Sequence, residues 1–146
     1  MNSVKHNIIN EKDLEKYVYL DIEGNKTNRI KNVIIQSKFY IDPKNNDETT
    51  QIVTFVAKKF SDTLLESQKC GEEKFSVDIY LNDLEVKDIN YEYIKYLADI
   101  LKQLFPERLS YARLIDAPRY FITAYEVIKK FIDPPTRKKL VFVKSK

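Results

Sequence analysis

The residues best suited to bind a ligand are Thr136, Arg137, Lys138 and Lys139, a hydroxyl and three cations in succession. A hydroxyl donor and charged nitrogen donors are the groups that hold a phosphate. The chain also contains 10 tyrosines and 8 phenylalanines, and such side chains can line a cavity for an apolar ligand. An apolar interior with a cationic mouth describes a phospholipid site. Patterning alone, however, favours the simpler interpretation of an ordinary core beneath a basic surface.

The sequence contains few of the residues that catalytic sites require. His6 is the only histidine and Cys70 the only cysteine, so a histidine-based zinc site, a Ser-His-Asp triad and a Cys-His pair are not expected. Gly24 and Gly71 are the only glycines, which excludes a glycine-rich phosphate loop. We therefore predict that the protein is not an enzyme, and we expect no metal site and no cofactor other than a bound phospholipid.

Charge is concentrated at the end of the chain. Residues 129–146 contain seven basic residues and one acid, a net charge of +6, whereas the whole chain carries +3. Such a segment can meet phosphate on a lipid, a membrane surface or a nucleic acid, although a solvated tail is the commoner case. The unpaired Cys70 and the lack of a secretory signal or an 18-residue apolar run predict an intracellular protein. We expect cytoplasmic localisation with peripheral membrane association.

Apolar periodicity predicts a single domain spanning residues 1–146. Strands at 17–22 and 33–41 are predicted to form a hairpin, followed by a helix that is capped by Asp47 or Thr49 and ended by Cys70-Gly71. A strand at 75–81 then precedes a helix whose apolar face runs from Ile94 to Leu104 and which is stopped by Pro106. The last predicted elements are a strand at 111–116, a helix at 119–132 and a strand at 139–143. Strands and crossover-length helices alternate from residue 74 onward. This order predicts an α/β fold, a mostly parallel sheet with helices packed on it.

Two segments, 106-PERLSYARLIDAP-118 and 131-FIDPPTRKKLVF-142, resemble the CRAL-TRIO lipid-binding domain. This is the family of phosphatidylinositol/phosphatidylcholine transfer proteins and of related carriers of tocopherol and retinal. Its motifs, an aromatic residue before P-E-R, a strand ending in N-A-P and then F-L-D-P-x-T-x-x-K, occur here in the same order. The resemblance is strongest over residues 75–143 and looser in the first half of the chain. It describes a minimal version of the domain, without the usual N-terminal helical bundle.

The resemblance implies a phospholipid pocket closed by a gating helix, which corresponds to residues 119–132. The threonine and lysine that hold the inositol phosphate in this family match Thr136 and Lys139. Glu107 matches the acid of P-E-R, which is associated with inositide binding, and it could equally serve as a cap or an ion-pair partner.

Four further positions are candidates for the pocket or for its headgroup end. Asp116 stands where the family usually has asparagine, and Arg137 belongs to the basic rim around Thr136. The strand positions that bind phosphatidylcholine in the family fall near Asp78 and Tyr80. Because a carboxylate repels a lipid phosphate, phosphatidylinositol is the expected ligand.

Two functions follow. The first is binding of phosphatidylinositol and its exchange at membranes. The alternative is a non-enzymatic protein-interaction or regulatory module of the same fold that has lost lipid transfer, with its apolar surface covered by self-association as a homo-oligomer. Nucleic-acid binding is not expected, because the basic stretch is short and lacks a stacking platform.

Overall fold

A five-stranded sheet forms the centre of the protein. The structure is a computed structural model that describes residues 10–36, 46–86, 89 and 91–145. The strands are β1 (Val18–Leu20), β2 (Lys31–Gln36), β3 (Phe75–Tyr80), β4 (Leu109–Ile115) and β5 (Leu140–Val143). Their order in the sheet is β1-β2-β3-β4-β5. β1 and β2 pair antiparallel, as the predicted hairpin requires, and every other pair is parallel. The predicted α/β class with a mostly parallel sheet is confirmed.

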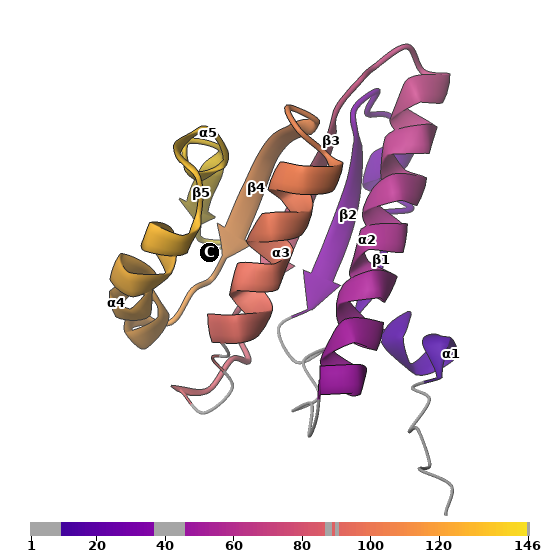
Figure 1. The fold of residues 1–146 in the computed structure, drawn as a ribbon. Helices are drawn as coiled ribbons and strands as arrows, with labels where there is room; N and C mark the ends of the chain where they lie inside the picture. The colour runs from indigo at the N-terminus through magenta and orange to yellow at the C-terminus, as the bar shows by residue number, and fades with distance from the viewer. Residues whose placement is uncertain (1–9, 37–45, 87–88, 90, 146) are drawn as a thin grey trace, which may run out of the picture.

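The helices lie on one face of this sheet (Figure 1). They are α1 (Glu11–Leu14), α2 (Asn46–Lys69), α3 (Tyr91–Leu104), α4 (Arg119–Ile128) and α5 (Pro134–Arg137), with 3₁₀ turns η1 (Gly24–Lys26) and η4 (Lys129–Phe131). From β2 onward each crossover moves to the next strand in the same direction. Because such crossovers are right-handed, the connecting helices fall on the same side of the sheet. None of the helices within the described ranges is long and apolar enough to cross a lipid bilayer.

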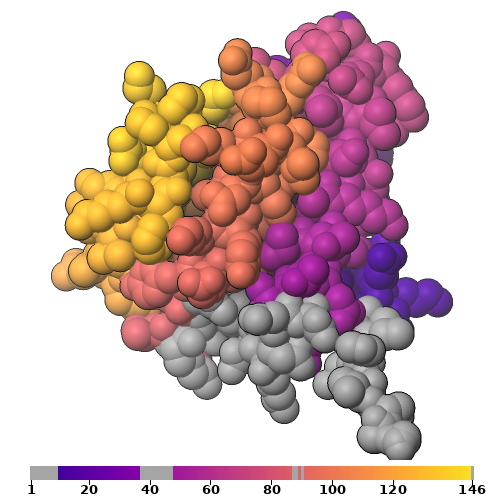
Figure 2. Space-filling view, viewed as in Figure 1, coloured from indigo at the N-terminus to yellow at the C-terminus, as the bar shows by residue number. Residues whose placement is uncertain are grey.

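From the helical side the sheet is hidden. In Figure 2 the atoms of α3 lie between those of α2 and those of α4 and the C-terminal segment. The buried residues of α3 are Tyr93, Ala98 and Ile100. Of the predicted apolar face, Ile94, Leu97 and Leu101 are partly buried, whereas Leu104 is exposed. α3 is therefore the central cover of the space above β3 and β4.

The end of α2 falls at the predicted glycine. Gly71 has φ +83°, in the left-handed region where glycine has no steric cost. The N–H of Glu72 donates to the carbonyl of Ser67 at 3.0 Å, and the N–H of Gly71 donates to that of Gln68 at 3.0 Å. These two bonds form a Schellman motif, which satisfies carbonyl groups at the end of the helix.

Several predicted boundaries are wrong, among them the start of β4, which lies at Leu109 and not at residue 111. α2 begins at Asn46, so Asp47 and Thr49 lie inside the helix and neither caps it. β2 begins before the predicted residue 33 and ends at Gln36, and residues 37–41 of the predicted strand lie outside the described residues.

The helix predicted over residues 119–132 is shorter than expected. α4 ends at Ile128 and continues as η4, after which the chain turns extended and begins α5 at Pro134. Asp133 caps α5, and proline is well suited to the first helical position because the N–H that it lacks has no partner there. Pro134 and Pro135 therefore begin a helix of their own.

The core has two parts. The first packs α2 against β1, β2 and β3 and centres on Phe60, Phe75 and Phe105, whose ring centroids lie 5.2 to 6.0 Å apart. The second lies beneath α3 and α4 and contains Leu114, Phe121 and Ile128, among others. A cavity lies where the two parts meet and is lined by residues of both.

Candidate functional site

An apolar cavity of about 160 Å³ lies between the sheet, α3 and α4. The sheet contributes Ile35, Val77, Ile79, Ala112, Leu114 and Leu140; α3 contributes Tyr93, Ile94, Leu97, Ala98 and Leu101; and α4 with the segment after it contributes Phe121, Tyr125, Ile128 and Ile132. The cavity follows from the sequence periods. Alternate residues of β3 and β4 point to the helical face, and one face of α3 points back at them.

A second cavity of about 150 Å³ adjoins the first and is lined in part by charged side chains. We call it the charged cavity. Its polar lining consists of Lys102, Glu107, Asp133, Thr136 and Lys139, and its apolar lining of Leu101, Phe105, Pro106, Leu109 and Pro135. Leu101 and Thr136 line both cavities. The two therefore share a wall, with an apolar space on one side and a charged space on the other.

Three residues that the sequence nominated for a lipid headgroup, Glu107, Thr136 and Lys139, line the charged cavity together. They come from the turn between α3 and β4, from α5, and from the residue before β5. The backbone holds Lys139 firmly, because its N–H donates to the carbonyl of Thr136 at 2.9 Å and its carbonyl accepts from Ala112 at 2.9 Å. Glu107 has φ +61°, a left-handed conformation that costs a non-glycine residue about 1–2 kcal/mol.

The charged cavity also contains two residues that sequence reasoning did not nominate, Lys102 and Asp133. One oxygen of Asp133, Oδ2, accepts from the backbone N–H of Thr136 at 3.4 Å, as expected of a helix cap. The other, Oδ1, is buried and has no hydrogen-bond partner among the described residues. Asp133 was visible in the D-P-x-T-x-x-K motif, and Lys102 lies in the last turn of the helix that leads into P-E-R. Both signals were available in the sequence.

Asp116 and Arg137 line neither cavity. Asp116 has φ +57°, and its carboxylate accepts from the N–H and the hydroxyl of Ser145 at 2.8 and 2.5 Å. Those bonds hold the pKa of Asp116 below its usual value. Arg137 donates to the carbonyl of Lys129 at 3.1 Å and so joins α5 to the start of η4. Both side chains connect segments of the backbone around α4.

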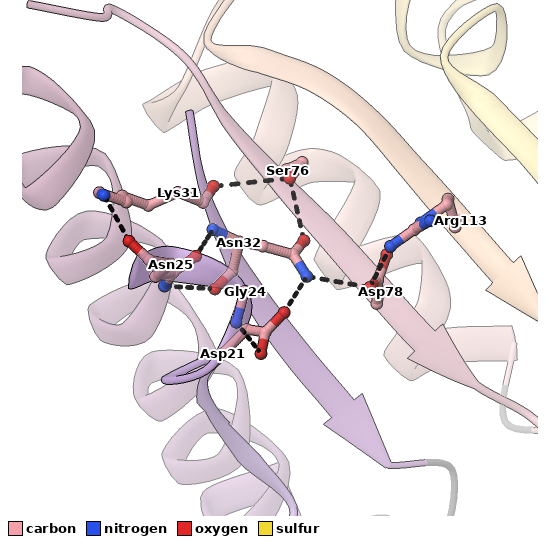
Figure 3. A network of polar contacts seen from close by, with 8 residues as sticks. All are labelled: Asp21, Gly24, Asn25, Lys31, Asn32, Ser76, Asp78 and Arg113. Carbon is pink, nitrogen blue, oxygen red and sulfur yellow. Dashed lines mark hydrogen bonds and ion pairs between the residues drawn. The ribbon is translucent and has the colours of Figure 1, made fainter. Parts of the chain in front are cut away.

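Asp78 and Tyr80 point to the sheet face opposite the helices and line neither cavity. Asp78 is only 3% exposed and binds the guanidinium of Arg113 through two contacts of 2.7 Å. It also accepts from Asn32 at 2.9 Å, and Ser76 extends the network (Figure 3). Burial and the neighbouring Asp78 carboxylate raise the pKa of Tyr80. This network ties β2, β3 and β4 together on the far face.

A few aromatic contacts attach α4 and η4 to the rest of the protein. The hydroxyl of Tyr120 donates to the carbonyl of Leu84, in the segment after β3. Tyr125 meets Phe142 of β5 edge to face at 5.3 Å, and burial raises the pKa of Tyr125. Phe131 and Tyr91 form another edge-to-face pair at 6.4 Å. α4 thus rests on aromatic edges beside the apolar cavity.

Comparison with known proteins agrees with this architecture. A sequence model of the CRAL/TRIO domain matches residues 9–146. The chain belongs to the CRAL/TRIO domain family. The resemblance predicted from the sequence is therefore confirmed. CRAL/TRIO domains bind lipids or other hydrophobic ligands and are in general not enzymes.

Among solved structures, the CRAL/TRIO domain described here is similar to "Crystal structure of Sfh5", with a TM-score of 0.66 and 17% sequence identity. The match covers 94% of this chain and 52% of the other. The chain therefore spans about half the length of that relative, and the two share a fold.

Proposed function

We propose that this CRAL/TRIO domain binds one molecule of phosphatidylinositol and exchanges it at membrane surfaces. The observation that carries the proposal is the shared wall of the two cavities, formed by Leu101 and Thr136. An amphipathic ligand needs such a junction, with its acyl chains on the apolar side and its headgroup on the charged side. The hydroxyl of Thr136 and the ammonium of Lys139 then converge on the headgroup phosphate.

The size of the apolar cavity supports a gating role for α4. Its volume of about 160 Å³ is below the ~300–1,000 Å³ of pockets that enclose drug-sized ligands. Two acyl chains need more room than this, and we propose that movement of one wall supplies it. α4 is the wall best suited to move, because it is held by the aromatic edges of Tyr125 and by one hydrogen bond from Tyr120, besides its apolar packing.

The outer surface of α4 and the basic C-terminal segment support membrane contact. Ile122 and Val127 are 45% and 47% exposed on α4, and Lys130, in η4, is exposed as well. Residues 129–146 carry +6, and each basic residue near an anionic leaflet contributes about 1 kcal/mol of attraction. Apolar contacts and charge would thus bring α4 to the bilayer, where its movement opens the apolar cavity.

The test compares Lys139→Ala with Lys138→Ala in the transfer of fluorescent phosphatidylinositol from donor vesicles. Both variants lose one positive charge, but Lys138 is exposed and lines neither cavity. Loss of a charge-assisted hydrogen bond predicts that Lys139→Ala lowers phosphatidylinositol affinity about tenfold or more. Lys138→Ala loses only the membrane attraction of one charge, which Lys139→Ala loses as well, so transfer by Lys138→Ala should fall less. Equal transfer by the two variants would count against the assignment of the headgroup.

A further inference from the structure

β5 is the last strand of the sheet, and its outer edge has no neighbouring strand among the described residues (Figure 1). On the inner side, the carbonyl groups of Lys139 and Val143 accept hydrogen bonds of 2.9 and 2.8 Å from β4 and the residue after it. Because backbone groups alternate in direction along a strand, those of Leu140 and Phe142 point away from β4. β5 therefore presents N–H and C=O groups with which an extended chain can pair.

The side chains of β5 are apolar and incompletely covered. Its four residues are Leu-Val-Phe-Val, and Val141 and Phe142 are 46% and 40% exposed. The strand at the other edge of the sheet, β1, is buried or half-buried throughout. An exposed apolar edge strand is a template for pairing with another chain. The outer edge of β5, which we call the β5 edge, is thus suited to bind a further strand.

The charges at the two ends of β5 decide between the possible partners. Lys138 and Lys144 are exposed and form no ion pair with any described residue. The carboxylate of Asp116, near Lys144, is occupied by the N–H and the hydroxyl of Ser145. Two copies of this chain paired edge to edge would bring their lysines together, and like charges across strands are destabilising. A strand with acidic ends is attracted instead.

We propose that the β5 edge binds an extended segment of a partner protein in which apolar residues are flanked by acidic residues. The segment adds a sixth strand to the five-stranded sheet and pairs with the outward backbone groups of Leu140 and Phe142. Its apolar side chains cover Val141 and Phe142, and its acidic ends meet Lys138 and Lys144. The β5 edge does not depend on a lipid in the cavities, so this inference is independent of the proposed function.

The experiment measures fluorescence anisotropy of a labelled peptide, alternating valine and threonine with glutamates at both ends, as the full chain is added. Comparison peptides carry lysines in place of the glutamates, or N-methyl groups on the central backbone nitrogens, which remove the donors of both edges. Phe142→Pro removes the outward N–H of β5, whereas Phe142→Ala keeps it. Lys144→Glu is matched by Lys95→Glu, because Lys95 is exposed on α3. Circular dichroism confirms that each variant is folded.

The acidic peptide should bind wild type and Lys95→Glu alike, and the two comparison peptides should bind at least tenfold more weakly. Phe142→Pro should lower the affinity about tenfold, Phe142→Ala less, and Lys144→Glu about threefold. Absence of binding to wild type, normal binding of the N-methylated peptide, or equal affinities of Phe142→Pro and Phe142→Ala overturns the proposal. A wild-type dimer in analytical ultracentrifugation that Phe142→Pro dissociates also overturns it, because a second copy then occupies the β5 edge.

Discussion

Filling the apolar cavity should stabilise the domain and abolish its lipid binding, and Ala98→Leu is the substitution that tests this. Ala98 is 6% exposed on α3 and lines the cavity. Leucine adds three carbon atoms, each contributing about 0.8 kcal/mol when buried without strain. A gain of about 2 kcal/mol is therefore expected.

Calorimetry of delipidated protein and the vesicle transfer assay read the two effects separately. The gain in stability corresponds to a rise in Tm of about 6 °C for a chain of this size, while phosphatidylinositol transfer should fall to background. Ala57→Leu is the control, because Ala57 packs against the first core cluster on α2 and does not line the cavity. It should leave transfer intact, whatever its effect on Tm. A lower Tm for Ala98→Leu together with normal transfer would refute the reasoning, because overpacking a filled core is destabilising.

Three further predictions concern the surroundings of the cavities. Asp78→Ala should lower the free energy of unfolding by about 2 kcal/mol in denaturant titrations and leave lipid affinity unchanged. This cost is less than that of breaking a fully buried ion pair, because the arginine partner of Asp78 reaches water. Weaker lipid binding by the folded variant would contradict the placement of Asp78 on the far face. Tyr120→Phe removes the bond to the carbonyl of Leu84, so lipid exchange measured by stopped-flow fluorescence should be faster, and unchanged exchange would exclude this bond from gating. The depressed pKa of Asp116 contributes stability at neutral pH that is lost as pH falls through the folded-state pKa. NMR titration of Ser145→Ala should show this pKa rising towards its usual value, and an unchanged pKa would contradict the role of the Ser145 hydroxyl.

Much of the fold could be predicted because it rests on local signals. Alternation in 75–81 and the apolar face from Ile94 to Leu104 gave β3 and α3, and their order required parallel pairing. Gly71 marked the end of α2 because only glycine adopts the left-handed conformation without cost. The P-E-R and D-P-x-T-x-x-K segments led to Glu107, Thr136 and Lys139, which line one cavity.

The remainder depends on contacts between distant residues. Alternation shows that Asp78 and Val77 point to opposite faces, but only the packing of helices decides which face holds the cavity. Asp78 thus meets Arg113, 35 residues later, on the far side of the sheet. Similarly, the motif could not show that one oxygen of Asp133 caps α5 while the other faces no donor. That distinction requires the three-dimensional arrangement.

The most direct test of phosphatidylinositol binding is to identify the lipid that the protein holds. The purified chain would be incubated with mixed vesicles of phosphatidylcholine and phosphatidylinositol, separated from them, and examined by native mass spectrometry with lipid extraction. We predict one phosphatidylinositol per chain, and none on Ala98→Leu. A wild-type protein that remains lipid-free, or that takes up phosphatidylcholine in proportion to its share of the vesicles, would contradict the proposal.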